Sequence, residues 1–132
     1  MINKLKELIK QNNLDGYILP KNDKYFTEYS IKNNLKIVSN FSGSAGFAII
    51  LRNKNYLFVD GRYTIQAKKE SGKRFKIIEI PYKWPKDIFK NLNIGFDPKL
   101  FTKSILNRYF KNSCDLIPIN QSIFDETYKN NK

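Results

Sequence analysis

Histidine is absent from the 132 residues, and cysteine occurs once, at Cys114. A zinc site made of cysteine and histidine needs several such side chains, so this class of site is excluded. A hydrolytic metal centre would have to be built from carboxylates alone, and no closely spaced cluster of Asp and Glu appears. We therefore expect no metal ligand, no catalytic residue and no cofactor within this chain. A lone cysteine also cannot form an internal disulfide, which agrees with a reducing compartment.

Long apolar runs are missing as well. The longest uninterrupted one, Phe47 to Leu51, is far shorter than a membrane-spanning helix requires. The opening MINKLKEL contains lysines, but the apolar stretch of a secretory signal does not follow it. These two absences predict a cytoplasmic protein without a membrane partner.

The composition is not that of a disordered chain. Apolar residues make up 41% and aromatic residues 14% of the sequence, which is typical of a folded protein. The length is that of one compact domain. We therefore expect residues 1–132 to form a single domain.

Acidic side chains number 12 against 24 Lys and Arg, so the formal net charge is +12. Such an excess suggests nucleic-acid binding, which requires clustered cations. The cations are not clustered: Arg52, Arg62, Arg74 and Arg108 are the arginines, and the lysines are spread along the whole chain. Phosphate and base recognition favour arginine and a localised patch. We therefore do not expect nucleic acid as a partner. A stand-alone basic α/β module that binds nucleic acid is kept as the alternative function.

Hydrophobic spacing predicts alternating helices and strands in the first part of the chain. Apolar residues recur at helical spacing over residues 2–12, which predicts an amphipathic helix. Two apolar runs on either side of the polar loop 52–55 predict a β-hairpin. A helix is expected from an N-cap at Asp60 to Ser71, followed by a strand at 75–80, as in a βαβ unit. The other expected elements are a strand at 17–19, a helix from Asp23 through Tyr29, and an extended segment at 37–38.

The second half continues the alternation. Strands are expected at 94–96 and 116–117, and a helix at 102–112 with Phe101, Ile105 and Tyr109 on its inner face. A last helical piece is expected over residues 123–128. Helices interleaved with a sheet that contains both a hairpin and crossovers make a mixed α/β fold. We expect about five or six strands flanked by helices.

Three conspicuous features receive structural interpretations. The glycine-rich run from Ser42 to Gly46 leads into a strand and has no lysine directly after it, unlike a phosphate-binding loop. Trp84 lies between two prolines and is expected to be a packing anchor. Cys114 is expected to lie in the core rather than to act as a reactive thiol.

The segment Asp60-Gly61-Arg62-Tyr63 lies where a buried strand passes into a helix, and such strand ends line ligand crevices in α/β folds. Asp60 is expected to cap the first turn of the helix. Arg62 needs a different explanation, because a cation in the first turn opposes the helix dipole and requires an anionic partner. That partner is either a protein carboxylate, such as Asp60 or a nearby Glu, or a carboxylate or polarised carbonyl of a ligand. The chemistry of the residues leaves both open.

Several motifs occur in an order that carries a family resemblance. They are GYILP (16–20), Asp23, Glu28-Tyr29, FSGSAG (41–46), DGRY (60–63) with Gln66-Ala67, GFDP (95–98) and LIP (116–118). The order resembles the N-terminal domain of Xaa-Pro aminopeptidases, which has the creatinase/prolidase-type fold, over nearly the whole chain. The GSAG segment followed at this distance by DGRY is specific to that family.

The resemblance implies a ribonuclease H-like mixed sheet joined to a downstream catalytic "pita-bread" domain of the same polypeptide. In the family that domain holds two metal ions, usually manganese, and releases the N-terminal residue of a peptide with proline at the second position. This chain would then be a non-catalytic domain, inactive by itself, that shapes the substrate entrance and the homodimer of the parent enzyme. Arg62, the arginine of DGRY, is the one residue that the resemblance marks as substrate-binding.

One position departs from the family, and one further function stays open. Family members often have a His in the segment before the Glu-Tyr pair, and Tyr25 stands there, so a polar role of that His does not carry over. A ribonuclease H-type nuclease would require acidic side chains that converge on two metal ions at strand ends. The candidates for that role are Asp15, Asp60, Asp97 and Asp115.

Overall fold

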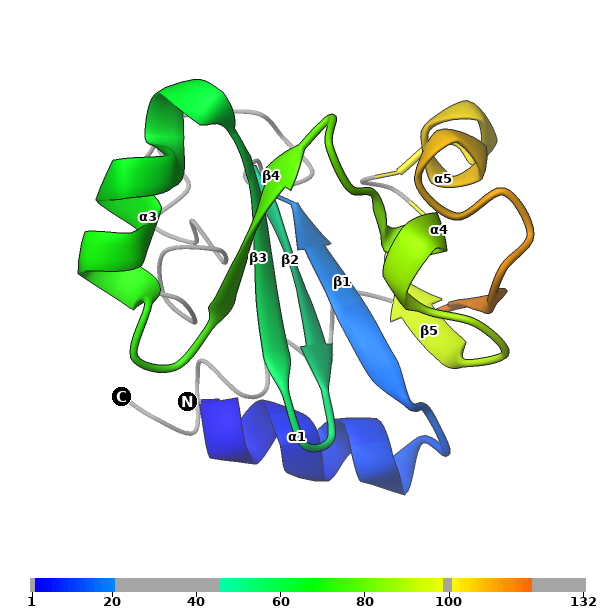
Figure 1. The fold of residues 1–132 in the computed structure, drawn as a ribbon. Coiled ribbons are helices and arrows are strands. Elements are labelled where there is room, and N and C mark those ends of the chain that lie inside the picture. Colours follow the sequence, from blue (N-terminus) through cyan, green and yellow to red (C-terminus); the bar gives the residue numbers. More distant parts are fainter. Residues whose placement is uncertain (1, 21–45, 99–100, 120–132) are drawn as a thin grey trace, which may run out of the picture.

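The computed structural model describes residues 2–20, 46–98 and 101–119, which contain a six-stranded sheet in the order β4-β3-β2-β1-β5-β6 (Figure 1). The strands are β1 (Gly16–Pro20), β2 (Phe47–Leu51), β3 (Asn55–Asp60), β4 (Lys76–Ile80), β5 (Asn93–Phe96) and β6 (Asp115–Pro118). Strand β2 is antiparallel to its neighbours β1 and β3, and the other neighbouring pairs are parallel. The predicted mixed α/β sheet of five or six strands is confirmed.

A helix precedes β1, and further helices connect β3 to β4, β4 to β5 and β5 to β6. They are α1 (Ile2–Gln11), the 3-10 helix η1 (Gly61–Tyr63), α3 (Thr64–Ser71), α4 (Pro85–Ile88) and α5 (Lys103–Phe110). Helix α3 makes the predicted crossover between β3 and β4, which are parallel neighbours. Helix α1 ends before Asn13, whose φ of 59° is left-handed, a conformation that asparagine adopts more readily than most residues. The predicted opening helix and hairpin are thus also confirmed.

The predicted N-cap at Asp60 is confirmed, but the first turn of the predicted helix at 60–71 differs from expectation. Asp60 is the last residue of β3, where it lies in register with Ile80 of β4. Its carboxylate accepts a hydrogen bond from the Arg62 backbone N–H at 2.9 Å, which fixes a tight first turn. The chain therefore passes through η1 before α3 starts at Thr64.

The sheet has a hydrophobic core on each face, and helices cover both faces (Figure 1). Along β1, Tyr17 and Leu19 belong to the core under α1 and α3, while Ile18 belongs to the core under α4 and α5. Strands β2 and β3 alternate in the same way. Because both faces are buried, these strands are continuous apolar runs rather than alternating polar and apolar ones.

The inner face of α5 differs from the predicted one. Leu106 and Phe110 are buried, whereas Ile105 is 36% exposed, so its placement on the inner face was wrong. Leu106 and Phe110 are four residues apart and share one side of the helix. Ile105 is rotated about 100° from Leu106 and about 140° from Phe110. Phe101 and Tyr109 do pack against this core, as predicted.

The interpretations of Trp84 and Cys114 are confirmed. Trp84 stacks on Tyr109 with ring centroids 5.6 Å apart. Cys114 is a buried free thiol in the core under α5. The short helix α4, which starts at Pro85 directly after Trp84, was not predicted.

Several predictions lie outside the described residues. These are the helix from Asp23 through Tyr29, which includes Tyr25, the extended segment at 37–38, the glycine-rich turn up to residue 45, and the helical piece at 123–128. Within the residues that are described, no helix combines the length and apolar character needed to cross a membrane.

Candidate functional site

The DGRY segment occupies the carboxyl-terminal end of β3. The parallel register of β3 and β4 places Asp60 beside Ile80. The chain therefore leaves both strands at the same edge of the sheet, the one formed by their carboxyl-terminal ends. Ligand sites of open α/β sheets lie at edges of this kind. Arg62 lies just beyond this end of β3, in the 3-10 helix η1.

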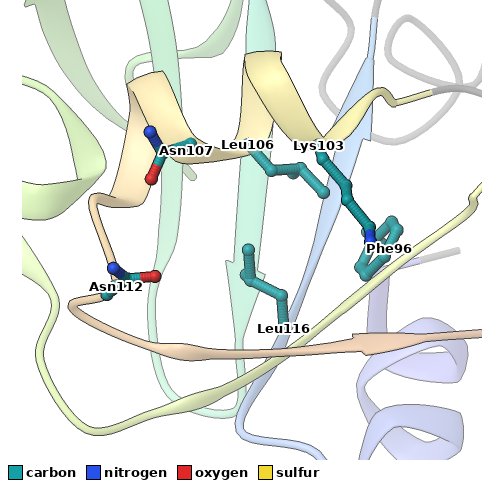
Figure 2. Close-up of a pocket in the computed structure, with 6 residues that line it drawn as sticks. All are labelled: Phe96, Lys103, Leu106, Asn107, Asn112 and Leu116. Atoms are coloured by element: carbon teal, nitrogen blue, oxygen red, sulfur yellow. The ribbon is translucent and has the colours of Figure 1, made fainter.

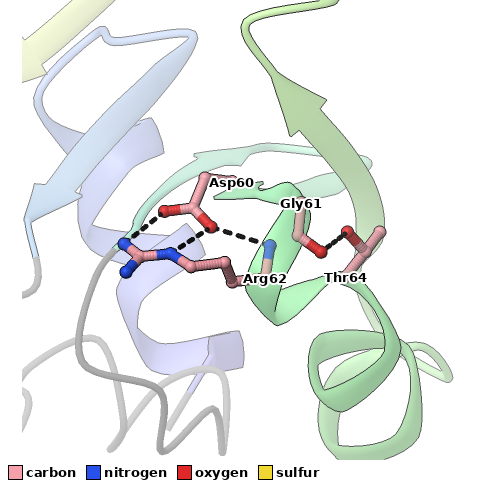
Figure 3. A network of polar contacts seen from close by, with 4 residues as sticks. All are labelled: Asp60, Gly61, Arg62 and Thr64. Atoms are coloured by element: carbon pink, nitrogen blue, oxygen red, sulfur yellow. Dashed lines mark hydrogen bonds and ion pairs between the residues drawn. The ribbon is translucent and has the colours of Figure 1, made fainter.

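Two nitrogens of the Arg62 guanidinium contact the two carboxylate oxygens of Asp60 (Figure 3). Its Nη2 donates to Asp60 Oδ2 at 3.0 Å, and its Nε donates to Asp60 Oδ1 at 3.3 Å. The guanidinium carbon also lies 5.3 Å from the centroid of the Tyr63 ring, within cation–π range. Of the two partners that the sequence left open, the protein carboxylate is therefore present.

The ion pair shifts both of its members toward their charged forms. The hydrogen bonds from Arg62 lower the pKa of the Asp60 carboxyl below its ordinary value. The same carboxylate raises the pKa of the Arg62 guanidinium. The Asp60 carboxylate also offsets the unfavourable position of a cation at the start of a helix.

The pair leaves most of Arg62 accessible. Its side chain is 78% exposed, against 33% for Asp60. A guanidinium carries five N–H donors in a rigid fork. Nε and Nη2 contact Asp60, and the part of the chain that the structure describes supplies no acceptor for Nη1. Arg62 is thus held in one direction while part of its fork still faces solvent.

Two residues that the sequence did not point to support this turn from β4 and α3. The Thr64 hydroxyl lies 3.0 Å from Glu79 Oε1 and 3.1 Å from the Gly61 carbonyl oxygen, and it can donate to either. Figure 3 shows the Gly61–Thr64 contact beside the Asp60–Arg62 pair. Only the β3–β4 register brings Glu79 next to this turn, so no local sequence signal could have found it.

Two large apolar side chains are exposed at the same edge. Ile65, in the first turn of α3, is 84% exposed, and Tyr82, two residues after β4, is 80% exposed. Both follow the strand ends that the Asp60–Ile80 pair brings together. Spacing alone did not identify them, because exposure depends on how α3 packs on the sheet.

The four aspartates proposed for a nuclease do not form a metal site. Within the described ranges, no group of three or more His, Cys, Asp or Glu side chains could hold a metal ion. Asp60 pairs with Arg62, and Asp15 accepts a hydrogen bond from the Asn93 backbone N–H at 2.7 Å. Asp97 is buried, and Asp115 is exposed at the start of β6. These four side chains do not fit a two-metal centre, so we assign no metal-dependent step to them.

The family comparison connects this geometry to known proteins. Residues 1–125 match the creatinase/prolidase N-terminal domain. The chain belongs to this family. The resemblance that the motif order suggested is thereby confirmed over nearly the full length.

Curated relatives of this family member are much longer than the chain. A protein of Laccaria bicolor named "Probable Xaa-Pro aminopeptidase P" is 33% identical over 92% of the chain, which covers 21% of that relative. A protein of Arthroderma otae with the same name is 37% identical over 75% of the chain, which covers 18% of it. The chain thus spans about a fifth of the length of the relatives it matches.

Solved structures share the fold. An X-prolyl aminopeptidase from Caenorhabditis elegans, described as a cytosolic enzyme with a di-nuclear active site, superposes with a TM-score of 0.77 at 23% identity. That match covers 99% of this chain and 25% of the other. The N-terminal domain of the cytoplasmic peptidase PepQ from Mycobacterium tuberculosis gives a TM-score of 0.69 at 18% identity, with 94% and 95% of the two chains covered. At these identities the likeness concerns the fold alone.

Proposed function

We propose that this chain acts as the single, non-catalytic N-terminal domain of a cytoplasmic, proline-specific metalloaminopeptidase of the Xaa-Pro type. In this proposal the domain shapes the substrate entrance and contributes to a homodimer of the parent enzyme. The observation that carries it is the match of residues 1–125 to the creatinase/prolidase N-terminal domain, together with relatives in which this domain is about a fifth of the polypeptide. The substrate would be a peptide with proline at the second position.

Catalysis would belong to a separate domain of the parent polypeptide. Two divalent metal ions, manganese in our proposal, would supply that domain with a hydroxide nucleophile. In this proposal the role of the present chain is binding and positioning.

Arg62 is the residue that we propose contacts the substrate. Its ion pair with Asp60 fixes the direction of the guanidinium, and its side chain is 78% exposed. A fork that is already oriented loses little conformational freedom when it binds a carbonyl or carboxylate oxygen of a peptide. Arg62 would thus orient the peptide over the catalytic domain.

Ile65 and Tyr82 support the idea that this edge of the sheet faces another part of the enzyme. Both side chains are at least 80% exposed in the chain by itself, and both lie at the edge that carries Arg62. Burial of such side chains against a second domain is favourable by roughly 1.5–3 kcal/mol each. The catalytic domain of the parent is the partner that the proposal assigns to them.

Replacement of Arg62 by Ala in the complete parent enzyme tests the role of this residue. Hydrogen bonds to charged groups contribute about 1.5–3 kcal/mol, so kcat/KM for a Xaa-Pro peptide should fall about tenfold or more. Steady-state hydrolysis of a proline-containing tripeptide measures the effect.

Arg74→Ala is the matched control, because Arg74 is also exposed but lies before the opposite end of β4. An unchanged kcat/KM in the Arg62 variant would leave Arg62 with a structural role only. The purified 132-residue chain serves as the second control, and we expect it to show no turnover. Proline-specific cleavage by this chain alone would contradict the proposed function itself.

A further inference from the structure

An open pocket of about 410 Å³ lies between α5 and the strands β5 and β6, on the side of the sheet where β6 is the outer strand (Figure 2). Its lining residues are Phe96, Lys103, Leu106, Asn107, Asn112 and Leu116. The volume lies within the range of small-ligand sites, roughly 300–1,000 Å³. Three strand spacings separate β5 from β3, about 14 Å, so the pocket is distinct from the Arg62 edge.

The pocket has three chemically different parts. Figure 2 shows Lys103 extending toward Phe96 at one end and the amides of Asn107 and Asn112 at the other end, with Leu106 and Leu116 between them. Leu106 is buried, whereas Leu116 and Phe96 are half-buried and present apolar surface to the opening. Among the described residues that line the pocket there is no carboxylate, so none of them compensates the positive charge of Lys103.

We propose that this pocket binds the C-terminal end of a short peptide whose last side chain is apolar. The terminal carboxylate would pair with Lys103, and the last side chain would pack on Leu106, Leu116 and Phe96. The carboxamides of Asn107 and Asn112 can each donate and accept, as the preceding peptide bond does, so they match its N–H and C=O. The net charge of +12 favours the approach of such an anion. This inference goes beyond the proposed function and does not depend on it.

NMR titration of the ¹⁵N-labelled 132-residue chain tests the proposal. The probes are N-acetyl-Gly-Leu as the free acid, the same dipeptide as its C-terminal amide, and 4-methylpentanoate, which keeps the carboxylate and the branched apolar group but lacks the peptide bond. The free acid should shift the backbone amides of Leu106 and Leu116 and the side-chain NH₂ groups of Asn107 and Asn112. The amide should bind about fivefold more weakly, as expected for the loss of an exposed charge pair. 4-Methylpentanoate should bind at least about fivefold more weakly, because it lacks the N–H and the C=O that the two asparagines would bind.

Lys103→Gln should weaken the free acid about fivefold and abolish its advantage over the amide. Arg108→Gln removes the same charge from an exposed position of the same helix that does not line the pocket, so it should leave the affinity unchanged. The ¹H–¹⁵N spectra of both variants report whether the fold is kept. Equal binding of acid and amide, equal binding of 4-methylpentanoate, shifts outside the pocket or no saturable binding would each overturn the proposal.

Discussion

The side chains packed around Gly95 leave no space for a side chain at this position. Gly95 lies in β5 beside β1, and a Cβ at this position would lie 2.8 Å from Leu14 Cδ1 and 2.8 Å from Tyr17 Cδ2. Leu14 and Tyr17 are both buried, with 0% and 2% of their surface exposed. Neither side chain can move aside without disturbing the core under α1. Glycine is therefore required here by the close approach of neighbouring side chains.

We expect Gly95→Ala to lower the free energy of unfolding by about 1–3 kcal/mol, the usual cost of overpacking a core. Urea denaturation measures the change. Gly61→Ala is the matched control, since its Cβ would lie 3.5 Å from Glu79 Oε2, an ordinary contact, at an exposed position. The control should change stability by no more than about 0.5 kcal/mol. Equal losses in both variants would show that close packing at Gly95 is not the reason.

At the scale of elements, a stack of aromatic rings joins both helices of one face to the centre of the sheet. Trp84 at the start of α4 stacks on Tyr109 of α5 at 5.6 Å. Tyr109 stacks on Phe47 of β2 at 4.4 Å, and Phe47 stacks on Phe58 of β3 at 4.8 Å. The stack stabilises the packing of α4 and α5 on the sheet, because stacked aromatic pairs contribute stability beyond that of their apolar burial.

Burial raises the pKa of the Tyr109 hydroxyl. Above its unfolded value of about 10, the unfolded chain loses this proton while the folded chain keeps it, so the free energy of unfolding falls as the pH rises. Tyr109→Phe removes this contribution. We therefore expect the variant to lose less stability than the parent chain between about pH 9.5 and 11, the range that brackets that value.

Urea denaturation followed by circular dichroism at each pH measures the difference. Tyr82→Phe is the matched control, because Tyr82 is 80% exposed and lies outside the stack. This control should follow the pH dependence of the parent chain. Parallel curves for the parent and the Tyr109 variant would contradict the assignment of alkaline sensitivity to Tyr109.

Periodicity predicted the elements whose apolar pattern is long enough to be distinctive. The opening helix, the hairpin and the β3–α3–β4 crossover belong to this group. Helix α4, four residues long, contains too few positions for a period to appear, and it was missed. The predicted inner face of α5 included Ile105, whereas Leu106 is the buried residue. Which of two adjacent apolar residues faces the core depends on the sheet that the helix packs against.

At the scale of the whole molecule, the net charge of +12 bears on whether the chain binds nucleic acid. Two of the arginines are engaged within the domain: Arg52 Nε donates to the Leu14 carbonyl oxygen at 2.8 Å, and Arg62 pairs with Asp60. The lysines are scattered along the sequence. Cations that are scattered along the sequence attract anions weakly, and we do not expect them to form the localised patch that nucleic acid requires.

We therefore expect no saturable binding of single-stranded or duplex DNA or RNA by the chain at low ionic strength, about 20 mM salt, where electrostatic attraction is strongest. Fluorescence anisotropy of labelled oligonucleotides measures this. Saturable binding that weakens steeply with added salt would instead support the basic nucleic-acid-binding module.

The sequence alone determined the family, the alternation of helices and strands, and the absence of a histidine-based metal site, because motif order, apolar periodicity and composition are properties of the chain itself. Only the tertiary structure decided that Asp60 pairs with Arg62, that Glu79 reaches the DGRY turn, and that Lys103 and two asparagines surround one apolar pocket. Those contacts depend on strand register and helix packing, which join residues that the sequence keeps apart.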